Sequence, residues 1–187
     1  MMLVMARIPY PDPASLLPET QETLAKIGDP PMNIFRMLAG GEGLLRAVSR
    51  FGNHLLFKSK LDPVLREIAI VRVGVLSDAT YEVYQHDRIS RGIGMSEELL
   101  AGIRNGSDDP VFTEIQAQVM RYTDDVVANV RASDATFDPL LAVLSVQELQ
   151  ELTVTIGFYM LVSRYLETFG VDIEQAGGAE MDMSRGR

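Results

Sequence analysis

The chain has 187 residues, a length that predicts one compact domain on a prior of about 150 residues per domain. Its 26 acidic residues outnumber its 17 basic ones, and the net charge of −9 disfavours nucleic-acid binding because phosphate backbones repel such a surface. Cysteine is absent, which excludes disulfides, thiolate metal sites and cysteine-based catalysis. Two histidines are too few for a histidine-rich metal site, and no metal is expected.

The capping residues, prolines and glycines along the chain are spaced as at the ends of helices. No run alternates between apolar and polar residues well enough to indicate a β-sheet. Asp62 followed by Pro63 predicts the N-cap and first residue of a largely apolar helix. Asp78 is expected to cap the next helix, and Ser145 with Glu148 forms a capping box for the last one. The helices are expected to cover approximately 18–27, 33–39, 42–58, 63–76, 79–94, 97–106, 110–131, a short segment after 138–139, and 145–169.

The predicted fold class is therefore all-α. We expect an N-terminal extension over 1–14, a single all-helical domain over 15–174 and a flexible C-terminal tail over 175–187, which is rich in Gly, Met and Ser.

No segment has the features of a secretory signal or of a membrane-spanning helix. The N-terminus has only a short apolar start before Arg7 and several prolines. The most apolar later stretch, 152–162, is shorter than the roughly 20 residues that a spanning helix needs. We expect a soluble, cytoplasmic protein with no membrane partner.

Glu67 is the first candidate for chemistry. It shares a helix face with the apolar positions four and seven residues later. Apolar surroundings favour the protonated form of a carboxyl, which suits a proton donor or acceptor. The alternative is a structural acid paired with an arginine, and the pattern alone favours that alternative. The candidate arginine partners are Arg66, Arg72 and Arg88.

His86 is the second candidate. It follows Glu82 by four residues, so a helix places the two side chains on one face, about 40° apart. A carboxylate that holds an imidazole in one tautomer is a common catalytic arrangement. A solvent-exposed i,i+4 pair of little consequence is the alternative.

The run LDPVLREIAIVRVGVLSDATYEVYQHDRISRGIGMSEELLAGI, about a quarter of the chain, carries a specific pattern. It combines a capped helix containing REIAIVRV, the segment YEVYQH and the segment GMSEEL. This run resembles the carboxymuconolactone decarboxylase-like family, which also contains the AhpD-type alkylhydroperoxidases. The resemblance implies an AhpD-like helical fold that assembles into homo-oligomers, either trimers or hexamers.

The resemblance also assigns positions. The peroxidase branch of the family has a glutamate at the position of Glu67 and a histidine at that of His86. Its two cysteines correspond to Ala79 and Glu82, so a thiol-dependent peroxidase mechanism cannot run in this chain. The decarboxylase branch lacks the cysteine pair as well, and this sequence is more similar to that branch.

What the decarboxylase branch implies is a cofactor-independent lyase of aromatic-compound catabolism. It would act by general acid/base catalysis on a small carboxylated lactone or a related acid, as 4-carboxymuconolactone decarboxylase does. Glu67 or His86 would protonate the carbon left after CO₂ departs, and Glu82 would orient the imidazole. Hydrogen bonds to the lactone and an arginine on the substrate carboxylate would hold the substrate. The candidate substrate-binding residues are Tyr81, Tyr84, Arg72 and Arg88.

A non-catalytic binding or assembly protein of the same fold is the alternative reading. The two readings differ in whether Glu67, Glu82 and His86 must lie near one cavity, as an enzyme would need.

Overall fold

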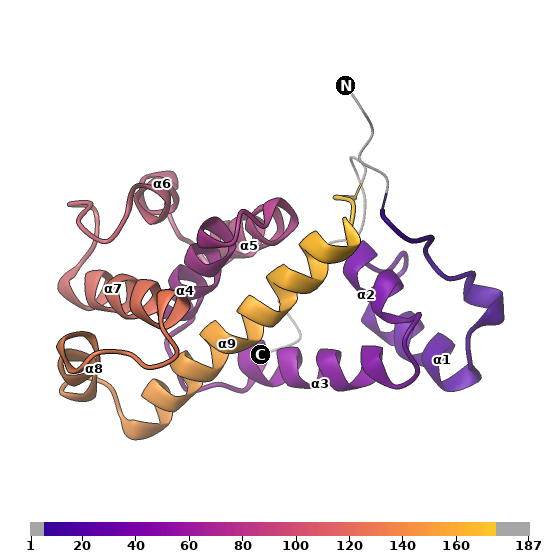
Figure 1. Cartoon of the computed structure of the whole chain (residues 1–187), viewed down its shortest axis with the longest axis horizontal. Helices are drawn as coiled ribbons and strands as arrows, with labels where there is room; N and C mark the ends of the chain where they lie inside the picture. Colours follow the sequence, from indigo (N-terminus) through magenta and orange to yellow (C-terminus); the bar gives the residue numbers. More distant parts are fainter. Residues whose placement is uncertain (1–5, 175–187) are drawn as a thin grey trace. The chain divides into compact units, whose positions relative to one another are not determined.

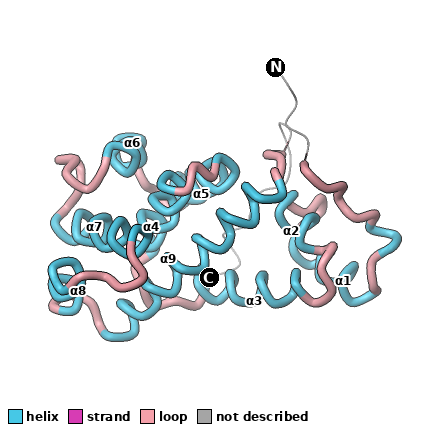
Figure 2. Tube along the Cα trace, viewed as in Figure 1, coloured by secondary structure: helices cyan, strands magenta, loops and turns pink. Residues whose placement is uncertain are grey.

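The computed structural model describes residues 6–174, and that part of the chain contains helices and loops but no strand (Figure 1, Figure 2). The predicted all-α class is confirmed. The predicted tail over 175–187 lies outside the described residues. In chain order the helices are η1 (Pro13–Ser15), α1 (Pro18–Ile27), α2 (Asn33–Leu38), α3 (Leu44–Phe57), α4 (Pro63–Leu76), α5 (Thr80–Gly92), α6 (Glu97–Asn105), α7 (Glu114–Ala128), α8 (Asp134–Leu141) and α9 (Val146–Phe169).

Contacts divide the chain into two compact units. Of the described residues, the first unit joins 6–58 with 165–174, and the second comprises 59–164. Contact density does not by itself define a domain boundary, so the single domain over 15–174 stays a prediction. None of the described helices is both long and apolar enough to cross a lipid bilayer.

In the unit of residues 59–164, α4 packs against α5, α6 and α7, and α7 packs against α8 (Figure 1). Every residue of α4 from Leu65 to Val71 is buried. Burying one Leu, Ile or Val side chain contributes about 1.5–3 kcal/mol, so this helix is a main source of the unit's stability. The expectation that α4 is buried on most sides is confirmed.

In the other unit, α3 packs against both α1 and α2. Its buried side chains are Leu45, Leu55 and Leu56, and its other residues include the basic side chains Arg46, Arg50 and His54. The end of α9 joins this unit through a hydrogen bond from the backbone N–H of Arg7 to the carbonyl of Phe169, at 2.8 Å.

Several predicted helix starts are wrong. Asp78 has a left-handed φ of 50° and is not the N-cap of α5, because the chain reverses there between α4 and α5. The helix expected from residue 110 begins later, since Thr113 and Gln116 form the capping box of α7. Asp109 instead accepts a hydrogen bond within the preceding turn. Pro139, expected near a helix start, lies inside α8.

Candidate functional site

The N-cap of α4 sets the register that carries Glu67 into the protein interior. The Asp62 carboxylate accepts hydrogen bonds from the backbone N–H groups of Val64 (2.8 Å) and Leu65 (3.1 Å). Pro63 occupies the first helical position, where its missing N–H costs nothing. The predicted cap is confirmed, and one and a half turns later Glu67 is completely buried.

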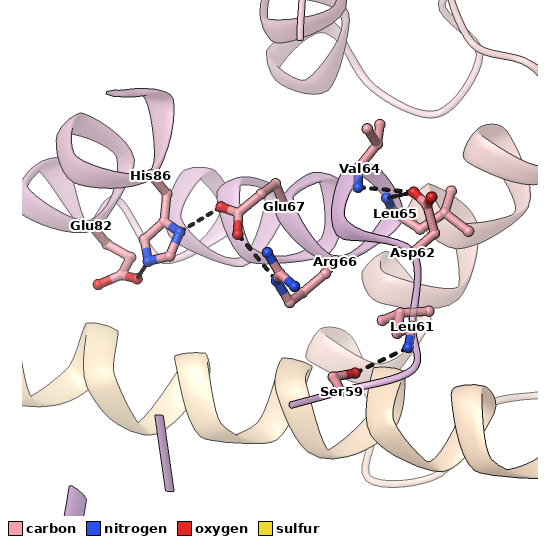
Figure 3. Close-up of polar contacts among 9 residues, drawn as sticks. All are labelled: Ser59, Leu61, Asp62, Val64, Leu65, Arg66, Glu67, Glu82 and His86. Carbon is pink, nitrogen blue, oxygen red and sulfur yellow. Dashed lines mark hydrogen bonds and ion pairs between the residues drawn. The ribbon is translucent and has the colours of Figure 1, made fainter. Parts of the chain in front are cut away.

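Both oxygens of Glu67 have a buried partner (Figure 3). The Nε of Arg66 donates to Oε1 at 3.2 Å, and Nδ1 of His86 lies 2.7 Å from Oε2. The arginine pairing expected for a structural acid is therefore present, with Arg66 as the partner. The same carboxylate also reaches the histidine 19 residues further on, so pairing with an arginine does not exclude a role in chemistry.

The second nitrogen of His86 faces Glu82, one helical turn earlier on α5. The distance from Nε2 to Oε1 is 3.1 Å, and both side chains are buried. Oε1 of Glu82 nevertheless has no hydrogen-bond partner among the described residues. The two groups are therefore close enough for an ion pair, but their orientation does not form a hydrogen bond. The exposed, inconsequential pair that the spacing also allowed is not what the structure shows.

Burial and charge act in opposite directions on these groups. Burial raises the pKa of Glu82 to about 7, with His86 opposing the shift and Glu67 adding to it. Burial alone would lower the pKa of His86, but the two neighbouring carboxylates outweigh it, so the net shift is upward. Both pKa shifts therefore favour the protonated forms of Glu82 and His86.

Tyr159 is a further side chain of the site, and the sequence analysis did not identify it. Its ring meets that of His86 edge-on, with the centroids 4.8 Å apart and the planes at 82°. Burial, followed by the charges of Glu82 and Glu67, raises the pKa of Tyr159 well above its usual range. The phenol thus stays protonated and can act as a hydrogen-bond donor. The sequence signal that could have identified Tyr159 is its position within the apolar stretch 152–162, where a tyrosine is expected to be buried.

The predicted substrate-binding residues are not all brought to this cluster. Tyr84 and Arg88 contact each other, with the guanidinium 5.4 Å from the ring centroid, about 200° around α5 from His86. Arg72 pairs with Asp124 through two hydrogen bonds of 2.6 and 3.0 Å. Tyr81, which directly precedes Glu82 in the sequence, is buried. The substrate-binding roles of these four residues stay predictions.

Among residues 6–174, no group of three or more His, Asp or Glu side chains has the arrangement of a metal site.

Solved structures with this fold come from several bacteria. A peroxidase-related protein from Ralstonia eutropha, described as an alkylhydroperoxidase AhpD core, matches with a TM-score of 0.81 and 18% identity, covering 94% of this chain and 95% of that one. A peroxidase-related protein from Silicibacter sp. matches with a TM-score of 0.77 and 17% identity, covering 93% of each chain. A protein of unknown function from Agrobacterium tumefaciens, described as a candidate antioxidant-defence protein AhpD, has a TM-score of 0.68 and 24% identity, covering 73% and 94%. The chain has an AhpD-like fold.

Residues 42–125 match the model of the carboxymuconolactone decarboxylase family. The matched segment contains Glu67, Glu82 and His86, so the cluster lies within the part of the chain that defines the family. The predicted resemblance to the carboxymuconolactone decarboxylase family is confirmed over residues 42–125, and the solved structures confirm the AhpD-like fold. No curated protein matches this sequence significantly.

Proposed function

We propose that this protein is a cofactor-independent lyase that decarboxylates a small carboxylated lactone or a related acid. The observation that carries the proposal is the buried pairing of Glu82 and His86, with His86 held from its other side by Glu67. Such a pair holds a proton near neutral pH, which is what protonation of a carbanion requires. The family to which residues 42–125 match supports this reaction class.

In the proposed reaction the bond between the substrate carbon and its carboxylate breaks. CO₂ leaves, and the bonding electron pair stays on the carbon, delocalised into the adjoining unsaturated system. The proton held by Glu82 and His86 then forms the new C–H bond, and solvent returns a proton to the pair. The sum is one carboxylate and one proton converted to one C–H bond and one CO₂.

The contacts favour distinct roles for the cluster. Glu67 is a positioning residue, because Arg66 and His86 occupy both of its oxygens. Glu82 is the better proton donor, since its Oε1 has no hydrogen-bond partner among the described residues. Tyr159 supplies a protonated phenol that would donate to the lactone carbonyl.

Peroxide reduction is not proposed, although two of the structural neighbours are described as peroxidase-related. A thiol-dependent mechanism needs a cysteine, and the sequence contains none.

Turnover of 4-carboxymuconolactone by the purified chain, followed by CO₂ release, tests the proposal. We expect His86→Ala and Glu82→Gln to lower kcat by about 10²–10⁴-fold, the range typical of general acid catalysis, while far-UV circular dichroism stays helical. Glu167→Gln is the matched control, because it neutralises an exposed carboxylate outside the cluster, and it should keep the full rate.

Full activity in both cluster variants would show that the site is wrongly assigned. If the folded wild-type protein decarboxylates neither this substrate nor other small lactone acids, the lyase proposal fails in favour of the non-catalytic reading.

A further inference from the structure

The unit that contains α1, α2 and α3 holds a cavity of about 850 Å³. Residues 23–58 alone form it, so it is separate from the cluster around His86, which lies in the other unit. Its volume falls within the roughly 300–1,000 Å³ typical of small-molecule sites.

One wall of this cavity is a row of basic side chains along α3 and its C-cap. Arg46, Arg50, His54 and Lys58 follow one another at four-residue spacing, which places them on one face of the helix. Lys26 adds another cation from α1, and no Asp or Glu is among the described residues that line the cavity. Like charges at this spacing destabilise a helix, and the whole chain carries a net charge of −9. A concentration of cations here therefore indicates a site for an anion.

Two of these cations are not already neutralised. Lys26 lies 3.9 Å from Glu22, and Arg46 lies 3.6 Å from Glu19. Arg50 and Lys58, in contrast, have no ion pair within residues 6–174. Their charges are available to a ligand.

Most of the remaining lining is apolar or aromatic. It includes Phe35, Phe57 and Phe51, and the last of these is 45% exposed despite its large apolar ring. Ser49 also lines the cavity, and its buried hydroxyl has no hydrogen-bond partner among the described residues. Aromatic rings beside unpaired cations and a spare hydroxyl suit a molecule that is apolar at one end and anionic at the other.

We propose that this cavity binds a small organic carboxylate with an apolar body, whose charged end meets Arg50 and Lys58 and whose body lies against the phenylalanines. The inference does not depend on the proposed lyase activity, because it uses no residue of the His86 cluster.

Calorimetric titration of the full chain with 2-naphthoate and with its neutral isostere 2-naphthamide tests the proposal. We expect naphthoate to bind at least tenfold more tightly than naphthamide. The double variant Arg50→Ala/Lys58→Ala should weaken naphthoate binding by about tenfold or more and leave naphthamide within twofold. Phe51→Ala should weaken both ligands, since it removes part of the apolar wall.

The control variant Lys60→Ala/Arg131→Ala removes the same charge from exposed positions outside the cavity and should change naphthoate binding by less than twofold. An equal loss in this control would show nonspecific charge attraction and overturn the proposal. Loss of naphthoate binding in Glu82→Gln, the cluster variant expected to cost little stability, would place the ligand at the other site and overturn it too. Absence of naphthoate binding, with a changed oligomer mass in Arg50→Ala/Lys58→Ala, would identify the surface as a contact between copies of the chain instead.

Discussion

The imidazole of His86 lies between two carboxyl groups, Glu67 at Nδ1 and Glu82 at Nε2. Arg66 adds one positive charge on the far side of Glu67. With His86 protonated and both carboxyls ionised, the four buried groups sum to zero. Loss of one charged member leaves a buried charge uncompensated, which costs far more than the intact cluster does. The two glutamates are not equivalent, however, because only Glu67 has a partner at each oxygen.

This asymmetry predicts different costs for two isosteric substitutions. Glu67→Gln should lower the free energy of unfolding at pH 7 by about 3–5 kcal/mol, because it strips Arg66 of its buried carboxylate partner. Glu82→Gln should cost much less, since burial raises the pKa of Glu82 to about 7 and the group is partly protonated at that pH. Urea unfolding of both variants measures the difference, and equal losses would contradict the asymmetry.

The same groups predict how stability depends on pH. The pKa of Glu82 is higher in the folded protein (about 7) than its ordinary 4.5, so the folded state binds more protons between these values and stability falls as pH rises through this window. The pKa of His86 is also raised, and its contribution is lost as pH rises above 6.5 through the folded value. Both shifts thus act in one direction.

We therefore expect the Glu82→Gln variant to lose less stability than the wild type between pH 5 and pH 8. Urea unfolding at intervals across this range measures it. A steeper fall in the variant would mean that another group governs the titration.

At the scale of elements, the site depends on the close approach of α4 and α5. Gly74 on α4 makes this approach possible: a Cβ built there would lie 2.9 Å from Cγ2 of Val83 and 3.5 Å from Cγ of Glu82. The first distance is shorter than real contacts allow, and a β-branched valine adjusts poorly. A side chain at residue 74 would push the α5 segment that carries Glu82 away from Glu67.

Gly74→Ala should therefore destabilise the protein by about 1–2 kcal/mol, despite the better helix propensity of alanine. Gly92→Ala is the matched control, because Gly92 is the exposed last residue of α5 and has nothing within 4 Å of the added methyl group. That variant should gain about 0.5–1 kcal/mol in the free energy of unfolding. Thermal unfolding of both proteins tests the pair, and a stabilised Gly74→Ala variant would show that α5 is free to shift.

At the scale of the whole molecule, the expected homo-oligomer stays a proposal, and an exposed apolar surface supports it. Val154 and Leu161 are 43% and 54% exposed and lie seven residues apart on α9, hence on one face. Val143 and Val146, which are also exposed, lie just before and at the start of this helix. Apolar side chains gathered in this way are typical of a subunit contact.

The wild type should therefore run as a multiple of 20.7 kDa in light scattering coupled to gel filtration. Val154→Glu/Leu161→Glu should shift the mass toward 20.7 kDa, because it places charges in the contact. Val130→Glu, at a fully exposed position in the loop between α7 and α8, should leave the mass unchanged. A wild type that is already monomeric would contradict the proposal.

Local signals in the sequence determined most helix positions and the identity of the central candidates. The Asp62 cap and the Ser145–Glu148 capping box join residues within three positions of each other, so their hydrogen bonds follow from the local sequence. Glu82 and His86 meet for the same reason, because one helical turn separates them.

Only the tertiary structure decided which partners these side chains have. Nδ1 of His86 reaches Glu67 across 19 residues, and Tyr159 reaches the same imidazole from α9, because packing of separate helices brings them together. The same packing pairs Arg72 with Asp124, 52 residues away, and leaves Arg88 beside Tyr84 on another face of α5. Spacing in a helix defines the faces of that helix, but which face meets which neighbour depends on how the apolar surfaces of all the helices pack.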